Sequence, residues 1–278
     1  MVSFRSASTI LQHTRNLKAL GLSALFAVLL SGVQGAQAAL YDANPANFGT
    51  ALAGPSDCDD CSDGPFAFGA GHSINFFGTT YTDLYVGSNG YVTFGAGASA
   101  FSPIPLDQQA ARPMIAAVLS DLDSRSDATS QVFVNTSTPG QIVVTWFGMG
   151  HWSQIYTGRS TFQLVIRSDQ LTVPGGQGQI GFFYGTVADT STAAAGFGDG
   201  LAAVNPGEVA FHNGPANALN DTHRWYNLNG GIPTPPPPAS VAPIPTLSEW
   251  SLALMALMAL VLGAVAVRRV SGQPGRQR

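Results

Sequence analysis

Lysine is almost absent from this chain of 278 residues: Lys18 is the only one, and charged residues of all kinds make up 10%. The central part, residues 39–231, has no lysine at all. It carries fifteen acidic residues against five arginines, which leaves a net charge of −10. The whole chain carries only −4, because its two ends are basic. Binding to nucleic acid is therefore disfavoured, since phosphate contacts require a basic surface.

Long apolar runs are missing from the middle of the chain and occur only near its ends. Near the beginning, three basic residues precede an apolar stretch at residues 19–33, and Ala36-Gln37-Ala38 follows with small side chains. This order is typical of a secretory signal peptide, which we assign to residues 1–38 and expect to form a helix. Cleavage is expected before Ala39, and the alternative is an uncleaved N-terminal anchor.

The second apolar run, residues 252–267, contains neither a charge nor a proline. As a helix, residues 251–267 would span about 26 Å, near the short limit for a bilayer core of about 30 Å. Trp250 would lie at one interface, and Arg268 and Arg269 at the other. Arginine favours the cytoplasmic side, so we expect a transmembrane helix with the bulk of the chain outside. A buried core helix is the alternative, and its uniformly apolar surface disfavours it.

The residues directly before this helix read Ile244-Pro245-Thr246-Leu247-Ser248-Glu249-Trp250. Motif, helix and basic cluster in this order resemble the IPTL-type C-terminal sorting signal, a relative of the PEP-type signals handled by exosortases. The resemblance covers residues 244–278. It implies a Gram-negative bacterium with an exosortase-type processing enzyme, recognition in the inner membrane, and cleavage near the motif. The helix would then be a temporary anchor.

A proline-rich segment, residues 232–243, precedes this signal. Consecutive prolines favour an extended polyproline II conformation, which is semi-rigid and rises by about 3.1 Å per residue. We expect a spacer between the domain and the sorting signal. The alternative is a proline-rich recognition motif.

Cysteine is as scarce as lysine, and Cys58 and Cys61 are the only two. In a reducing cytosol a Cys-x-x-Cys pair is redox-active or supplies half of a zinc site. This chain has no second pair to complete such a site, and its signal peptide indicates export to a compartment where disulfides persist. We expect a local disulfide between the two.

Residues 39–231 are sufficient for one domain with a core, at about 190 residues. Residues 160–167 alternate apolar and polar side chains, which is typical of a half-buried strand. Other expected strands are residues 73–77, 81–86, 91–94, 131–134, 141–147 and 179–184. Asn89-Gly90 favours a tight turn between two of them, and residues 112–119 fit either a strand or a short helix. The pattern predicts an all-β, sandwich-like ectodomain.

Residues 84–94, followed by Pro113-Met114-Ile115-Ala116 and Ser120-Asp121-Leu122-Asp123, resemble the nidogen-like (NIDO) extracellular domain. The resemblance continues in order to residues 195–197 and covers roughly residues 66–211. It departs from the family pattern at Ala117-Val118-Leu119, where aromatic residues are usual. In animals such domains occur in matrix and adhesion proteins. The resemblance implies an extracellular interaction module without known catalysis.

Asp121, Asp123 and Asp127 lie in one acidic, serine-rich loop. Calcium requires several oxygen ligands, and such spacing supplies them. The same residue types also form turns and caps through bonds from side chain to backbone. Both interpretations stay open, although the loop lacks the glycine and the bidentate glutamate of a typical calcium loop. A second acidic cluster at residues 57–63 surrounds the cysteines, and we expect it to be a solvated loop.

Catalytic motifs are also missing. The chain has no Gly-x-Ser-x-Gly elbow and no His-Glu-x-x-His motif. Asp121 and Asp123 could be considered a glycosidase pair, but residues two apart lie too close for most inverting enzymes. We expect no enzymatic activity and no cofactor, with calcium as the one alternative left open.

These observations favour an exported surface or matrix protein that binds exopolysaccharide or surface proteins in the envelope or biofilm. Exosortase-type sorting is generally associated with exopolysaccharide production. The alternatives are a purely structural biofilm protein and a calcium-dependent carbohydrate-binding module. An exposed aromatic row would favour sugar binding, and clustered acids would favour a metal. The aromatic candidates are Trp152, Tyr156, Trp225 and Tyr226.

Overall fold

A computed structural model describes residues 40–103, 106, 112–201, 209–235, 254 and 257. The chain divides into two compact units, Met1–Pro236 and Pro237–Arg278. The expected signal peptide, the sorting motif at residues 244–250 and the arginines at 268 and 269 lie outside the described residues. Of the expected membrane helix only Leu254 and Leu257 are described, both as helical. Within the described part of the chain, no helix has the length and apolar character needed to cross a membrane.

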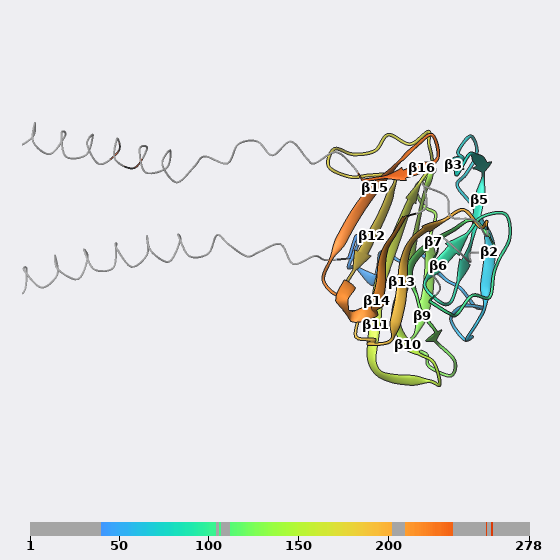
Figure 1. The fold of residues 1–278 in the computed structure, drawn as a ribbon, viewed down its shortest axis with the longest axis vertical. Coiled ribbons are helices and arrows are strands. Elements are labelled where there is room, and N and C mark those ends of the chain that lie inside the picture. Colours follow the sequence, from blue (N-terminus) through green and yellow to red (C-terminus); the bar gives the residue numbers. More distant parts are fainter. Residues whose placement is uncertain are drawn as a thin grey trace, which may run out of the picture. The chain divides into compact units, whose positions relative to one another are not determined.

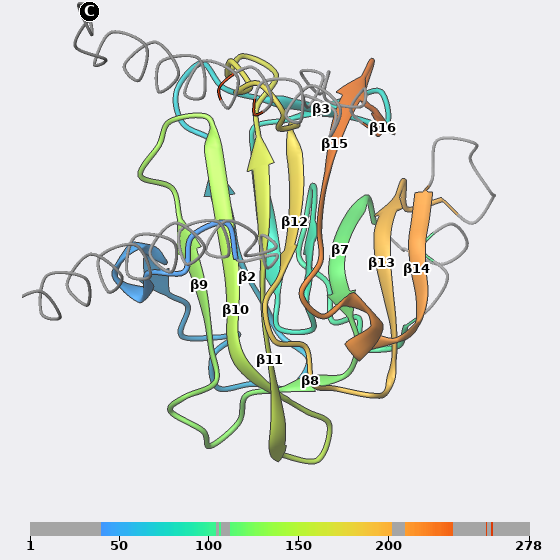
Figure 2. The ribbon, with the colours of Figure 1, turned by 90° about the vertical axis from the view of Figure 1, so that its left-hand side faces the viewer.

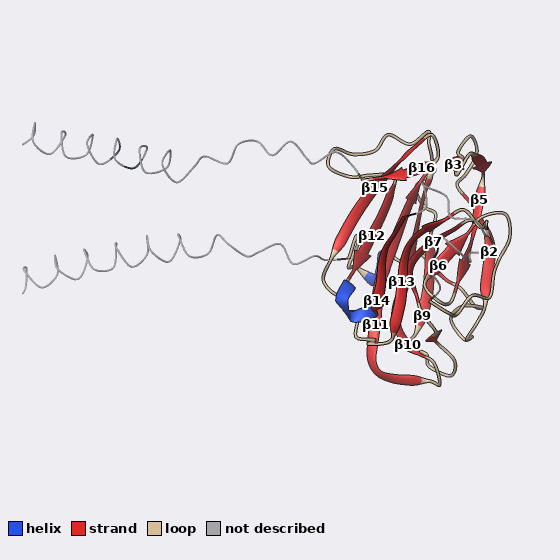
Figure 3. Ribbon diagram, in the orientation of Figure 1, coloured by secondary structure: helices blue, strands red, loops and turns tan. Residues whose placement is uncertain are grey.

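The described part of the first unit is built almost entirely from antiparallel strands, with two short 3-10 helices, η1 (Pro45–Asn47) and η2 (Ala216–Leu219) (Figure 3). The larger sheet faces the viewer in Figure 2. Its strand order is β1 (Thr50–Ala51), β9 (Gln131–Asn135), β10 (Gln141–His151), β11 (Ile155–Arg167), β12 (Ile180–Tyr184), β15 (His223–Asn229) and β16 (Ile232–Thr234). The short strand β8 (Leu122–Asp123) pairs with the end of β10.

The second sheet packs against the first across a shared apolar core. Figure 1 shows the two sheets from the side. Its strand order is β14 (Val209–Pro215), β13 (Thr192–Gly198), β7 (Met114–Leu119), β6 (Tyr91–Thr93), β5 (Asp83–Gly87) and β2 (Ser62–Ala67). A separate hairpin consists of β3 (Ile74–Phe76) and β4 (Thr79–Tyr81). The predicted all-β, sandwich-like fold is therefore confirmed for this domain.

The core lies between the two sheets and follows the alternation seen in the sequence. Strands β10 and β11 pair so that Trp146 lies opposite Phe162, and the two rings stack with their centroids 5.1 Å apart. Both residues are fully buried, as are Ile142 and Val144 on β10 and Leu164 and Ile166 on β11. Strand β7 is buried along its whole length because a second, smaller apolar cluster covers its outer face. Full burial of all six residues explains why residues 112–119 show no clear strand period.

Two hydrogen bonds cross the core from one sheet to the other. The indole Nε1 of Trp146 in β10 donates to the backbone oxygen of Gly87 in β5 at 2.9 Å. The hydroxyl of Tyr184 in β12 donates to the backbone oxygen of Ala117 in β7 at 3.0 Å. Burial raises the pKa of the Tyr184 hydroxyl, so that it remains a donor. A buried aromatic side chain with a polar end needs such a partner, and these two fix the relative position of the sheets.

Several strands were not predicted. Strand β13 is rich in alanine and glycine, which are weak strand signals, and it forms because β7 and β14 flank it. Strand β16 lies in the segment assigned to the proline-rich linker. Its backbone pairs with β15, with Pro233 opposite Leu228. Proline is tolerated there because β16 is an edge strand. The folded domain therefore extends to Thr234, beyond the expected boundary at Gly231.

The Tyr184–Ala117 hydrogen bond gives the first testable prediction. We expect Tyr184→Phe to lower the free energy of unfolding by about 1–3 kcal/mol, because a buried carbonyl loses its partner. For a domain of this size each kcal/mol shifts Tm by about 2–4 °C. Thermal melts of the exported protein measure the change. Tyr81→Phe is the matched control, since the Tyr81 ring packs on Phe94 at 5.0 Å in a partly buried position. An equal loss in both variants would show that the cross-sheet bond contributes nothing specific.

Candidate functional site

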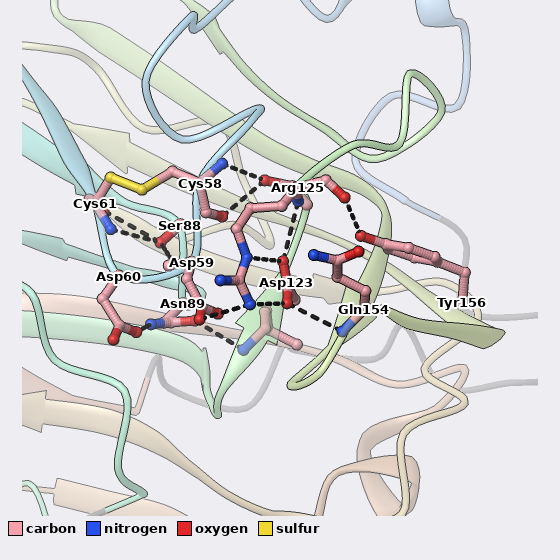
Figure 4. A network of polar contacts seen from close by, with 12 residues as sticks. Cys58, Asp59, Asp60, Cys61, Ser88, Asn89, Asp123, Arg125, Gln154 and Tyr156 are labelled. Atoms are coloured by element: carbon pink, nitrogen blue, oxygen red, sulfur yellow. Dashed lines mark hydrogen bonds and ion pairs between the residues drawn. A yellow bond between two sulfur atoms is a disulfide. The ribbon is translucent and has the colours of Figure 1, made fainter.

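Four loop segments meet at one end of the sandwich (Figure 4). They are the cysteine loop at residues 57–61, the β5–β6 turn at residues 88–90, the loop at residues 120–127, and the tip of the β10–β11 hairpin at residues 151–156. The first and third segments carry most of the domain's clustered acidic residues. Because these two segments lie side by side, carboxylates that are about sixty residues apart in sequence come close together in the fold.

Three of these acidic residues form a compact group, which we call the acidic cluster: Asp59, Asp60 and Asp121. One carboxylate oxygen from each lies within 4.8 Å of the other two. Burial, together with the neighbouring carboxylates Asp59, Asp60 and Asp123, raises the pKa of the Asp121 carboxyl from 3.8 to about 6. Burial and Asp123 also raise the pKa of Asp59. Like charges held this close disfavour ionisation of one another.

Arg125 is the cation that balances this group. Its guanidinium binds Asp123 through Nε at 3.0 Å and Nη2 at 2.5 Å, and Nη2 also lies 2.8 Å from Oδ2 of Asp59. The backbone amides of Arg125 and Gln154 donate to the same Asp123 carboxylate at 3.0 and 3.1 Å. Burial alone would raise the pKa of Asp123, but these hydrogen bonds lower it. Four donors saturate the two carboxylate oxygens, so Asp123 anchors the loop and has no capacity left for a metal.

Asp127 belongs to a separate ion pair. Its carboxylate binds the guanidinium of Arg159, and it accepts from Thr129 and from the Ser130 hydroxyl, the latter at 2.8 Å. Although burial acts in the opposite direction, these bonds hold the pKa of Asp127 well below its usual range. The predicted trio of Asp121, Asp123 and Asp127 is thus divided. Only Asp121 joins the acidic cluster, and its partners Asp59 and Asp60 come from the loop expected to be solvated.

The β5–β6 turn holds the surrounding loops in place. The side chain of Asn89 is fully buried. Its Nδ2 donates to Asp60 at 2.8 Å and to the backbone oxygen of Ala100 at 3.0 Å, while its Oδ1 accepts from the amide of Leu122 at 2.7 Å. Gly90 has φ of +78°, and a Cβ there would lie 2.1 Å from the oxygen of Val118. The sequence predicted the turn from this Asn-Gly pair, but it gave no sign that the asparagine side chain is a structural centre.

The structure contains the expected disulfide between Cys58 and Cys61, with Cα atoms 5.9 Å apart. The loop it closes is tied to two other segments. Ser124 accepts from the amide of Cys58 at 3.2 Å, and Ser88 accepts from the amide of Cys61 at 3.1 Å. The disulfide therefore holds Asp59 and Asp60 toward Asp121 rather than leaving them in a free loop.

The hairpin tip at residues 151–156 lies beside the acidic cluster. The amide of Trp152 donates to the backbone oxygen of Asp121 at 2.8 Å, and the hydroxyl of Tyr156 binds the backbone oxygen of Arg125. Trp152 is 61% exposed and Ile155 is 40% exposed. Of the other aromatic candidates, Trp225 is half-buried on the outer face of the larger sheet, and Tyr226 is in the core. The four residues do not form one exposed row.

The arrangement limits the chemistry available at this end. The acidic cluster offers three carboxylates, each able to bind through one or two oxygens, whereas calcium requires 6–8 oxygen ligands, so backbone groups or water would have to complete the set. Asp59 already shares its charge with Arg125. One oxygen of Asp59, Oδ1, is buried without a hydrogen-bond partner. Asp121 is the carboxyl in this group best placed to take up a proton near neutral pH.

Comparison with known proteins adds the family. A family model described as NIDO related matches residues 36–228. The chain belongs to the NIDO-related family. A second model, the IPTL-CTERM motif, matches residues 242–278, which include all seven motif residues from Ile244 to Trp250. No solved structure matches the chain. Both resemblances inferred from the sequence are thereby confirmed, and the second implies processing by an exosortase-type enzyme.

Two of the segments that carry the NIDO resemblance, residues 84–94 and 120–123, reach the acidic end of this NIDO-related domain. Residues 84–94 form β5, the Asn89 turn and β6, while residues 113–116 begin β7 and residues 120–123 contribute Asp121 and Asp123. These two segments therefore include the Asn89 turn and the loop at residues 120–123 that the Asn89 side chain holds in place. The exposed hairpin tip lies outside those segments.

The raised pKa of Asp121 predicts a pH-dependent effect of Asp121→Asn. A carboxyl whose pKa is raised on folding destabilises the fold where it is ionised, above pH 6, and ceases to do so as the pH falls below its unfolded value near 4. We expect Asp121→Asn to stabilise the domain by about 1 kcal/mol at pH 7, after allowance for solvent screening. This advantage should vanish near pH 4. Tm measured across this range tests it.

Asp83→Asn is the control, since Asp83 lies at the opposite end of β5 from the turn. It should leave the pH dependence of Tm unchanged. The prediction assumes that no cation neutralises the cluster, so melts with and without a chelator belong to the same experiment. A chelator-induced fall in Tm, together with destabilisation by Asp121→Asn at pH 7, would contradict it and identify a calcium site.

Proposed function

We propose that this protein is exported to the cell surface or extracellular matrix, where its NIDO-related domain acts as a non-enzymatic binding or adhesion module. The observation that carries the proposal is the succession of the two matches. The NIDO-related region ends at residue 228, and the IPTL-CTERM region begins at residue 242. The chain thus joins an extracellular type of domain directly to a sorting signal.

The two targeting segments suggest the order in which the protein is exported, anchored and cleaved. The signal peptide directs export, and the apolar helix at residues 251–267 then holds the precursor in the inner membrane with Arg268 and Arg269 inside. An exosortase-type enzyme reads the motif at residues 244–250 and removes the tail. The domain is thereby released from its first anchor, and it reaches the surface, the envelope or the biofilm matrix.

The domain itself suits an oxidising exterior. The Cys58–Cys61 disulfide closes a loop that depends on it for position. Disulfides persist in exported proteins and are rare in the cytosol. The lack of lysine and the net charge of −10 also disfavour binding to nucleic acid or to anionic surfaces.

The described residues support a binding role rather than catalysis. Asp123, one of the two residues considered as a glycosidase pair, is fully buried and saturated by four donors. Oγ of Ser168 lies 2.8 Å from Nδ1 of His72, which is the spacing of a nucleophile and its base. Ser168, however, is also fully buried. A serine without access to substrate does not act as a nucleophile. Neither pair offers a group placed for catalysis.

The processing step predicts a clear mutational result. We expect the double change Pro245→Ala and Glu249→Ala to block removal of the tail, because the motif is read by an enzyme. Met255→Leu should have no effect, because the helix is recognised chiefly by its apolar length. Intact-mass measurement of the protein exported by cells with an exosortase distinguishes the forms. Export of a wild-type chain that still ends at Arg278 would refute the sorting role.

A further inference from the structure

A second site lies on the outer face of the larger sheet, where the first described residues cross it. We call residues 40–49 the N-terminal strap (blue, beside β9 and β10 in Figure 2). At one end of the strap, Tyr41 packs against Phe183 with ring centroids 5.4 Å apart. At the other end, Phe48 packs against Phe133 and Phe147 at 5.6 and 5.7 Å. Aromatic contacts thus fix both ends of the strap on the sheet.

A buried glutamine fixes the strap between these ends. The side chain of Gln163 in β11 binds the backbone of Asp42 twice, accepting from its amide at 3.0 Å and donating to its oxygen at 2.9 Å. The same Nε2 group donates to the Thr145 hydroxyl at 2.9 Å. Gln163 and Thr145 are fully buried. These hydrogen bonds fix the position of the strap backbone on the outer face of the sheet.

The space between the strap and the β9–β10 turn is a pocket of about 300 Å³. The residues that line it include Tyr41, Asp42 and Asn47 from the strap, and Asn135, Gln141, Val143 and Gln163 from the strands of the larger sheet. Pockets for small ligands measure about 300–1,000 Å³, so this one accommodates a single small group. Amides, a carboxylate and one aromatic ring dominate its lining.

Several polar groups in this pocket can still donate or accept further hydrogen bonds. Gln141 uses its Oε1 to accept from Nε of Arg167 at 2.8 Å, which leaves its amide protons for a ligand. The Asp42 carboxylate accepts from the Asn44 amide and from Nδ2 of Asn47, both at 2.9 Å, and each oxygen keeps a further lone pair. The hydroxyl of Tyr41 accepts from Arg167 at 3.3 Å, so its own proton remains available.

We propose that this pocket binds one ring of a neutral saccharide. Vicinal hydroxyls of a sugar need both donors and acceptors at fixed positions, which the Gln141 amide and the Asp42 carboxylate supply. The Tyr41 ring also lines the pocket, and the part of it that Phe183 and Arg167 leave open contacts the sugar's C–H groups. Asp42 is the only charged residue among the described residues that line the pocket. Its carboxylate repels uronic acids and sulfated sugars, so the ligand is neutral.

This inference rests on the proposed binding role and names its ligand class. The probes are cellobiose, maltose and N,N′-diacetylchitobiose, with glucuronic acid as the anionic comparison. They are titrated by calorimetry into the protein as cells export it. We expect at least one neutral disaccharide to bind in the millimolar range or tighter, and glucuronic acid not to bind.

Gln141→Glu tests the site without removing the acceptor that Arg167 needs. It replaces the free amide donor with a second carboxylate, so we expect affinity to fall at least about tenfold, or about 1.4 kcal/mol. Thr138→Trp, at the exposed rim, should also reduce binding by filling the space. Gln131→Glu is the matched control on β9 outside the pocket, and it should leave affinity unchanged. Melts of all three variants check that the fold is retained.

Two results would overturn the inference. If no neutral disaccharide binds, the pocket is not a saccharide site. If one binds equally well to wild type, Gln141→Glu and Thr138→Trp, the site lies elsewhere, and the proposed binding role stands without this pocket. The sorting part of the proposed function is judged separately by the mass of the exported chain.

Discussion

The acidic end of the domain depends on one buried asparagine. Asn89 uses its amide and carbonyl groups on three separate segments, at Asp60, Ala100 and Leu122. It lies in a turn that only glycine at position 90 permits, because a Cβ there would collide with the Val118 oxygen. The backbone oxygen of Gly90 in turn accepts from the amides of residues 117 and 118 in the central strand β7. A polar side chain buried at this depth is favourable only when all its groups are paired, so the loops around it have little freedom to move.

This constraint explains how the domain tolerates clustered acids with so few cations. The Asn89 turn and the disulfide fix Asp59 and Asp60 close to Asp121, and Arg125 is the one guanidinium in contact with the group within the described chain. Arg125 neutralises Asp123 and part of Asp59. Burial of the Asp121 carboxyl and the remaining repulsion from its acidic neighbours together raise its pKa. The fixed loops therefore keep the three carboxylates of the acidic cluster close together, next to the hairpin tip that carries the exposed Trp152.

Elements that are encoded by neighbouring residues could be predicted from the sequence, whereas contacts between residues far apart in the chain could not. The alternation around Phe162 and the Asn89-Gly90 turn are local patterns, and both appear in the structure. The acidic cluster joins positions 59 and 121, and the strap joins positions 42 and 163, so neither follows from spacing. Strand β13 has only one β-branched residue, Thr192, and β16 contains a proline. Their pairing partners, not their propensities, make them strands. The C-terminal sorting signal was recognisable in the sequence because it is a short contiguous motif.

The two expected processing sites lie close in sequence to the folded domain and its pocket. The N-terminal strap begins directly after the expected cleavage point before Ala39, and its Tyr41 and Asp42 already form part of the saccharide pocket. At the other end, β16 completes the larger sheet at Thr234, ten residues before the motif at Ile244. Both expected cuts therefore fall just outside the hydrogen-bonded structure. The strap is held by Gln163 and by aromatic contacts that come entirely from the domain, so removal of either targeting segment takes away none of the groups that build the acidic end or the pocket.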